Sequence, residues 1–188
     1  IHEFVRAGIQ IKGPQLHQYW RVATDNHGAT PWPPEGPFQS ATLRLSKDKV
    51  AFEMMLHAVA ATLPTGAPLW VYGANDEGIK STTKKLSPLF CEIETVDTRR
   101  HCRVLRAHRS AEQDILRPRL EDWVMTGTLP HANGPIEHRH YPGIFAKGKL
   151  DPATALLLEA IELPAAGSHV LDYACGAGVI AAELRRRQ

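Results

Sequence analysis

A glycine-containing turn near the C-terminal end of the chain, Asp172-Tyr-Ala-Cys-Gly-Ala-Gly178, carries the residues best suited to bind a ligand. The apolar pair before it, at 170–171, predicts a short buried strand, and residues 179–187 after it are rich in helix formers. Glycine at positions Gly176 and Gly178 lets the backbone approach a ligand closely, because a side chain would stand in the way. Free amides at the start of the following helix can donate to an anionic group.

A helix is predicted directly before this strand. Asp151 followed by Pro152 is a strong helix start, since an N-cap carboxylate precedes a proline at the first helical position. The following residues are apolar nearly all round, which predicts a well-buried helix that ends at Leu163-Pro164. The C-terminal part should therefore run helix, strand, tight turn, helix.

The same order of elements occurs earlier in the chain. Ser46 can cap a helix that extends to Leu63-Pro64, with Asp48 in its first turn. Residues 69–72 predict a strand, residues 73–78 a turn, and the residues up to Lys85 a basic helix. Two more strands are expected at 91–98 and around 104–105, so the fold class is α/β.

The two passages also match position by position. A displacement of one hundred residues places Leu63-Pro64 on Leu163-Pro164, Ala74 on Ala174 and Gly78 on Gly178. Because the order of elements matches as well, we interpret the chain as two related units.

The differences between the two units bear on function. Asp172 corresponds to Tyr72, and Gly176 corresponds to Asp76. An acidic side chain at this turn position would crowd and repel an anionic ligand. We therefore expect only the second unit to bind a cofactor.

Composition limits the remaining possibilities. The 188 residues have a net charge of +2 and 43% hydrophobic residues, which is typical of an ordinary globular protein. No apolar run approaches the length of a membrane span. The three cysteines show no metal-binding or disulfide spacing, which favours a reducing, cytoplasmic compartment. Prolines and glycines make 128–143 the best candidate for a linker between the units.

Arginines are concentrated in one short segment. Arg99, Arg100, Arg103 and Arg106 are joined by further arginines at 109, 117 and 119. Such a cluster can contact phosphates of a nucleic acid. A solvated protein surface with ordinary arginines explains the same pattern equally well.

Other candidate sites are weaker. His138 and His140 have the spacing of a metal-ligand pair, but a solvated linker explains them better, and no metal is expected. Cys175 is interpreted as a small side chain that packs beneath the turn rather than as a nucleophile.

The turn Asp172-Tyr-Ala-Cys-Gly-Ala-Gly178 resembles the first motif of class I S-adenosylmethionine-dependent methyltransferases. The preceding stretch from Tyr141 to Asp151, with Thr154, is similar to the lead-in of the "methyltransferase small" group. Within that group, the small-subunit ribosomal RNA guanine methyltransferases are most similar. The stretches 71–81 and 96–102 resemble segments of their non-catalytic half.

This resemblance implies a Rossmann-like fold in two copies. A degenerate N-terminal domain would occupy residues 1–135, and the linker and first elements of the catalytic domain would occupy 136–188. The implied activity is methylation of a guanine exocyclic amine in ribosomal RNA, with S-adenosylmethionine as cofactor. The implied cofactor-binding residues are Asp172, Ala174, Gly176, Gly178, Phe145, Asp151 and Thr154. The motif that grips the target amine is expected beyond Gln188, so the chain resembles an incomplete enzyme.

Two other functions remain open at this point. A nicotinamide-dependent oxidoreductase also places glycines after a strand, but its fingerprint is GxGxxG, whereas this turn reads DxxxGxG. Alternatively, the chain serves as a non-catalytic domain that binds RNA or supports a partner domain.

Overall fold

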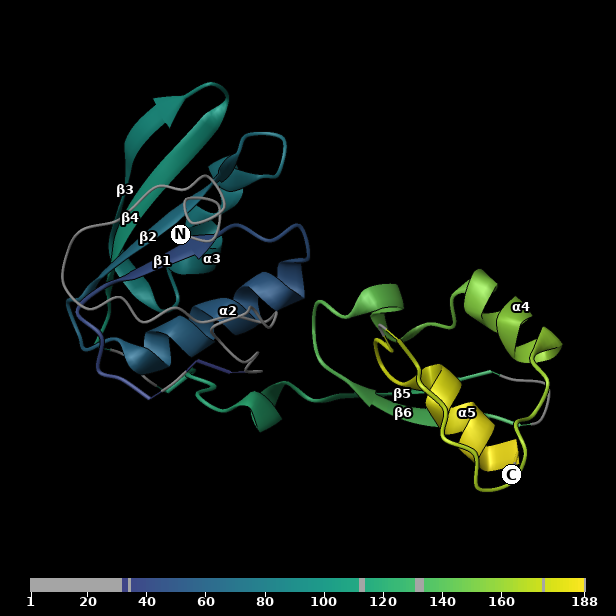
Figure 1. Cartoon of the computed structure of the whole chain (residues 1–188). Helices are drawn as coiled ribbons and strands as arrows, with labels where there is room; N and C mark the ends of the chain where they lie inside the picture. Colours follow the sequence, from purple (N-terminus) through teal and green to yellow (C-terminus); the bar gives the residue numbers. More distant parts are fainter. Residues whose placement is uncertain (1–31, 34, 112–113, 131–133, 174, 188) are drawn as a thin grey trace.

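A computed structural model describes residues 32–33, 35–111, 114–130, 134–173 and 175–187 (Figure 1). The first part holds a mixed sheet with one long helix, and the second part holds a hairpin with two helices. The elements are β1 (Ala41–Arg44), α2 (Lys49–Thr62), β2 (Pro68–Ala74), η1 (Ile79–Ser81), α3 (Thr83–Leu86), β3 (Phe90–Arg99), β4 (Cys102–Arg109), η2 (Leu120–Trp123), β5 (Met125–Leu129), β6 (Ile136–His140), η3 (Phe145–Gly148), α4 (Pro152–Ala160) and α5 (Val179–Arg187).

The first sheet has the strand order β1-β2-β4-β3. β1 pairs with β2 in parallel, whereas β2 with β4 and β4 with β3 are antiparallel. The strands predicted at 69–72, 91–98 and 104–105 are confirmed as β2, β3 and β4. Side chains alternate along β2, so Leu69 and Val71 are buried while Trp70 and Tyr72 are half-buried.

Helix α2 covers the buried face of this sheet. Its N-cap is Asp48, whose carboxylate accepts hydrogen bonds from the amides of Val50 at 3.0 Å and Ala51 at 2.9 Å. The predicted helix is therefore confirmed, but the predicted cap Ser46 is wrong, because its hydroxyl accepts from the Asp48 amide before the helix begins. Phe52 and Leu56 from α2 pack against the buried strand residues to form the core.

The predicted linker at 128–143 is largely a β-hairpin instead. β5 and β6 pair antiparallel, with Leu129 opposite Ile136. The prolines and glycines that suggested a linker lie between the two strands and in the turn after β6, because such residues mark tight turns as well as linkers.

The C-terminal part follows the predicted order except for the strand. Asp151 caps α4 through the amides of Ala153 and Thr154, and Pro152 is its first residue, as predicted. The predicted strand at 170–171 is absent: no described segment pairs with it, and Leu171 is 85% exposed. A parallel strand of this kind needs neighbours to supply its hydrogen bonds.

The prediction that α4 is well buried is also wrong. Leu158 is the one buried residue of this helix, and Leu156 is 67% exposed. The helix ends at Ala160, before the predicted Leu163-Pro164. Across the described ranges, no helix combines the length and apolar character needed to span a membrane.

Candidate functional site

The turn before α5 has the geometry expected of a ligand-binding loop. Gly176 and Gly178 have φ angles of +56° and +72°, in the left-handed region that favours glycine. The Gly178 amide donates to the Cys175 carbonyl at 2.8 Å. The Ala182 amide donates to the Gly178 carbonyl at 2.9 Å, which begins the helix. No atom lies within 4 Å of where a Gly178 side chain would begin. The turn is therefore tight and leaves open space beside its backbone.

Asp172 lies at the entrance to this turn. The residue as a whole is half-buried, and the Oδ2 atom of its carboxylate is buried without a hydrogen-bond partner among the described residues. A buried carboxylate oxygen without a partner is costly, so such atoms are commonly found where a ligand supplies the missing donor. Ala174, another predicted contact, lies outside the described residues.

The predicted lead-in residues lie at different places. Ile144, the neighbour of Phe145, comes within 4.0 Å of where a Gly176 side chain would begin, which brings this segment to the turn. Phe145 itself is 74% exposed. The Asp151 carboxylate is engaged as the α4 cap with the Thr154 amide, so both residues have a structural role in the helix start.

The corresponding turn of the first unit is closed by its own side chain. Gly78 is also left-handed, with φ of +93°, and it also precedes a helical turn. Here the Glu77 carboxylate accepts from the Ala74 amide at 3.0 Å and from Arg44 at 2.9 Å. The Ala74 hydrogen bond, followed by the Arg44 hydrogen bond, lowers the pKa of Glu77.

Sequence reasoning assigned this blocking role to a different residue. Asp76 is exposed, whereas Glu77 is the acid that occupies the turn. The missed signal is a long-range one: Arg44, at the end of the neighbouring strand β1, is the partner of Glu77.

The arginine segment divides into exposed and structural residues. Arg99 and Arg100 lie at the turn between β3 and β4, where the Arg99 side chain is 84% exposed. Arg103 donates to Asn75 at 3.1 Å. Arg106 pairs with Glu94 and lies over the Trp70 ring. These four predicted RNA contacts share β3, β4 and the turn between them.

The other arginines of the segment make contacts within the protein. Arg109 is buried and donates to backbone carbonyls, and Arg117 stacks on Trp123 with its guanidinium carbon 3.7 Å from the ring centroid. Arg119 pairs with Asp122 at 3.0 Å.

Two further predictions about single residues are corrected. His138 and His140 are buried in β6 with their rings stacked 4.9 Å apart, so they do not belong to a solvated linker. Within the described ranges, no group of three potential metal-ligating side chains occurs. Cys175 is exposed rather than packed beneath the turn.

His57 on α2 provides a testable pH dependence. Its Nδ1 atom accepts from the Arg117 amide at 3.0 Å, and burial, then the positive charges of Arg117 and Arg109, lower its pKa, partly offset by Glu53. As the pH falls below about 6.5, the unfolded chain takes up a proton that the folded chain resists. We therefore expect stability to fall with decreasing pH in this window and to be restored above it.

Urea unfolding at a series of pH values measures this dependence. The variant His57→Gln should show a flatter profile between neutral and mildly acidic pH than the original protein. An unchanged profile would remove His57 as its source. His140, whose pKa burial and His138 also lower, contributes with the same sign.

Comparison with known proteins identifies the family. The family described as "Methyltransferase small domain N-terminal" matches residues 15–126. The chain belongs to this family. A second family, "Methyltransferase small domain", matches residues 136–188.

Proteins with similar sequences support this assignment to the methyltransferase small family. "Ribosomal RNA small subunit methyltransferase C" of Stutzerimonas stutzeri (strain A1501) is 38% identical over 82% of this chain and 45% of its own length. The protein of the same name from Pseudomonas putida (strain GB-1) is 36% identical over 89% of the chain and 48% of its length. The chain thus spans about half the length of these relatives. The predicted resemblance to small-subunit ribosomal RNA methyltransferases is confirmed.

A solved structure shows the same fold. The Thermus protein titled "T. Thermophilus 16S rRNA N2 G1207 methyltransferase (RsmC) in complex with AdoMet and Guanosine" matches with a TM-score of 0.60 and 26% identity. The match covers 70% of this chain and 35% of that one. The predicted α/β fold class, with a Rossmann-like methyltransferase fold, is confirmed.

Proposed function

We propose that this chain is part of an S-adenosylmethionine-dependent enzyme that methylates a guanine exocyclic amine in small-subunit ribosomal RNA. The observation that carries the proposal is the open turn at Gly178 beside the unpartnered buried oxygen of Asp172. The related Thermus protein, which was solved in complex with AdoMet and guanosine, supports the choice of cofactor and substrate.

The residues of the turn fit this cofactor. Gly176 and Gly178 leave the backbone accessible, and the Asp172 carboxylate offers an acceptor for the amino group of the methionine moiety. Phe145, Asp151 and Thr154 are proposed as further contacts, supported by the position of Ile144 against the turn. The bound cofactor supplies an electrophilic methyl group, and the protein contributes alignment with the amine.

The RNA contacts are proposed for the exposed arginines of β3 and β4. Arg99 and Arg100 extend from the hairpin turn, and Arg103 and Arg106 lie along β4. Their shared location supports a single phosphate-binding surface. Arg106 also pairs with Glu94, which must compete with any phosphate.

The domain division is proposed at 1–135 and 136–188. The two family matches, at 15–126 and 136–188, support it. The β5–β6 hairpin crosses the proposed boundary and connects the two parts. We place the protein in the cytoplasm, as expected for an enzyme acting on ribosomal RNA.

A non-catalytic role is the second candidate function. It is favoured by the turn that Glu77 closes in the first unit and by the exposure of Leu171 and Tyr173 beside the second turn. In this alternative the chain binds RNA or supports a partner domain and does not bind the cofactor.

Calorimetric titration of the 188-residue chain with S-adenosylmethionine tests the proposal. The variant Gly178→Ala should bind at least about ten-fold more weakly, because its new side chain enters the open space of the turn. Gly167→Ala is a matched control: Gly167 has φ of +82° and is equally uncrowded, but it lies outside the turn.

Both variants should lose a similar stability of about 1 kcal/mol, since each puts an L side chain at positive φ. Equal affinities for the two variants would contradict the assignment of the turn. Absence of cofactor binding by the original chain would favour the non-catalytic role.

A further inference from the structure

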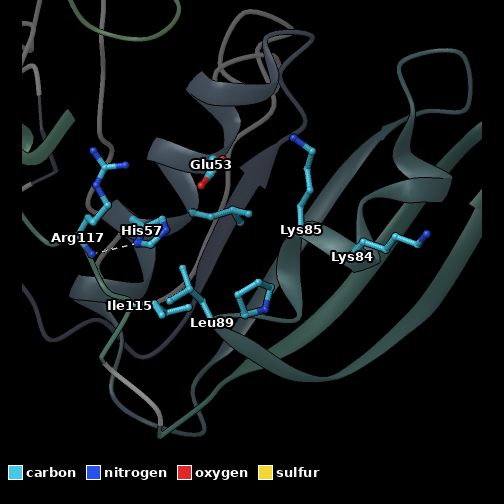
Figure 2. Close-up of a pocket in the computed structure, with 9 residues that line it drawn as sticks. Glu53, His57, Lys84, Lys85, Leu89, Ile115 and Arg117 are labelled. Atoms are coloured by element: carbon cyan, nitrogen blue, oxygen red, sulfur yellow. Dashed lines mark hydrogen bonds between the residues drawn. The ribbon is translucent and has the colours of Figure 1, made fainter. Parts of the chain in front are cut away.

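A pocket of about 350 Å³ opens in the first part of the chain, away from the glycine turn (Figure 2). This volume lies at the lower end of the range for small-ligand sites, large enough for one nucleotide but not for a duplex. The pocket is lined by Glu53, Leu56, His57, Lys84, Lys85, Pro88, Leu89, Ile115 and Arg117.

One side of the pocket is apolar. Leu56 and Leu89 are buried, and Pro88 and Ile115 are exposed beside them. In Figure 2, Leu89 and Ile115 lie across the hollow from the helix that carries Glu53. The exposed Pro88 and Ile115 side chains form the accessible apolar floor, and a base that lies against them buries apolar surface, which is favourable.

The polar side of the pocket combines an acceptor with a fixed histidine. Glu53 and His57 are four residues apart on α2 and therefore share one helix face. The Arg117 amide donates to His57 Nδ1, drawn as a dashed line in Figure 2. This bond joins the segment before η2 to α2 and keeps that wall of the pocket in place.

Positive charge predominates among the residues that line the pocket. The lining residues include three cations, Lys84, Lys85 and Arg117, and one carboxylate, Glu53. The Lys85 ammonium donates to the Lys49 carbonyl at 3.2 Å, and Arg117 stacks on Trp123, so both are held near the rim. Lys84 is exposed and extends outward. This charge balance favours an anionic ligand.

We propose that this pocket binds one unpaired nucleotide of an RNA, with its base on the apolar floor and its phosphates near Lys84 and Lys85. Glu53 accepts a hydrogen bond from an amino group of the base, as carboxylates do from the amine of cytosine. The inference rests on the proposed function only in taking RNA as the substrate, and it adds a contact separate from the arginines of β3 and β4.

Fluorescence anisotropy with a labelled oligocytidylate of about twelve nucleotides tests the charge at the rim. The double variant Lys84→Gln/Lys85→Gln should bind about ten-fold more weakly, and the slope of affinity against salt should fall by about one. The double variant Lys47→Gln/Lys80→Gln removes the same charge from exposed residues outside the pocket. This control should change affinity about two-fold or less.

The variant Glu53→Met, which removes both the acceptor and the charge, tests base recognition by the sign of its effect. If Glu53 accepts from the base, its loss weakens binding several-fold. If the pocket acts only through general charge, removal of a repelling carboxylate strengthens binding, and the proposal is overturned. Photocrosslinking with 4-thiouridine in the oligonucleotide should label the peptides that contain Pro88 or Ile115.

The outcomes separate this inference from the proposed function. Equal RNA affinities for the two lysine double variants would overturn the proposed nucleotide site. Crosslinks confined to peptides without Pro88 or Ile115 would overturn it as well. If Arg99→Gln/Arg100→Gln then abolishes binding, the proposed RNA surface stands without the pocket. If the original chain binds no RNA, both RNA sites are overturned, while calorimetry with S-adenosylmethionine still decides the cofactor turn.

Discussion

Replacement of Arg109 by methionine is expected to destabilise the protein by about 3–5 kcal/mol, because buried carbonyl groups would lose their donors. Arg109 is 2% exposed at the end of β4. Its guanidinium donates to the carbonyls of Ala60 at 3.0 Å, Leu89 at 3.2 Å and Ser110 at 2.7 Å. One side chain therefore ties α2 to the residue before β3 and to the residue after β4.

Urea unfolding measures this effect, with Arg106→Met as the matched control. Arg106 lies on the same strand but is half-exposed and pairs with Glu94 at the surface. Pairs of this kind contribute less than about 1 kcal/mol. Similar losses for the two variants would show that the Arg109 contacts contribute no more than a surface pair. Arg109→Lys should fall between them, since an ammonium cannot reproduce the planar fork.

Replacement of Asp172 by asparagine is expected to weaken S-adenosylmethionine binding by about 30–100-fold, which corresponds to about 2–2.7 kcal/mol. The proposed reason is loss of a charged acceptor that is half-buried and has one oxygen, Oδ2, without a partner among the described residues. Hydrogen bonds to ionised groups are the stronger kind, so the change of charge alone should suffice.

Stability distinguishes a ligand-binding role of Asp172 from a structural one. Because the unpartnered oxygen costs free energy in the folded chain, Asp172→Asn should leave the free energy of unfolding unchanged or slightly higher. A structural aspartate would instead lose stability and affinity together. The control Asp76→Asn changes the exposed acid of the first unit and should alter neither quantity.

Local signals in the sequence predicted much of this fold correctly. Asp151 and Pro152 start α4 because an N-cap acceptor and a proline need only the residues next to them. The strand β2 was likewise predictable from its own apolar residues. The turn at Gly176 and Gly178 follows from positive φ angles that glycine adopts at little cost.

Features that depend on distant residues were missed or wrong. The strand predicted at Val170 and Leu171 has suitable residues, but no described segment lies beside it to complete its hydrogen bonds. The β5–β6 hairpin was hidden because its loop has the composition of a linker. The burial of Arg109 also escaped prediction, because its partner Ala60 lies in a different element.

The cofactor contacts themselves stay predictions. Gly176, Gly178 and Asp172 lie where the sequence indicated, around one turn. Asp151 and Thr154 illustrate the limit of pattern reasoning, since the hydrogen bond between them explains their presence without any ligand.

The carboxylate of Glu77 has a consequence for how the first unit responds to its surroundings. The Glu77 carboxylate accepts from the Ala74 amide and from Arg44, so the chain itself satisfies these donors without a ligand. The free energy of unfolding of this unit should consequently not depend on ligand concentration. A unit with an open turn gains stability as the concentration of its ligand rises. If the turn at Gly178 binds the cofactor as proposed, the stability of the first unit stays constant while that of the second rises with cofactor concentration.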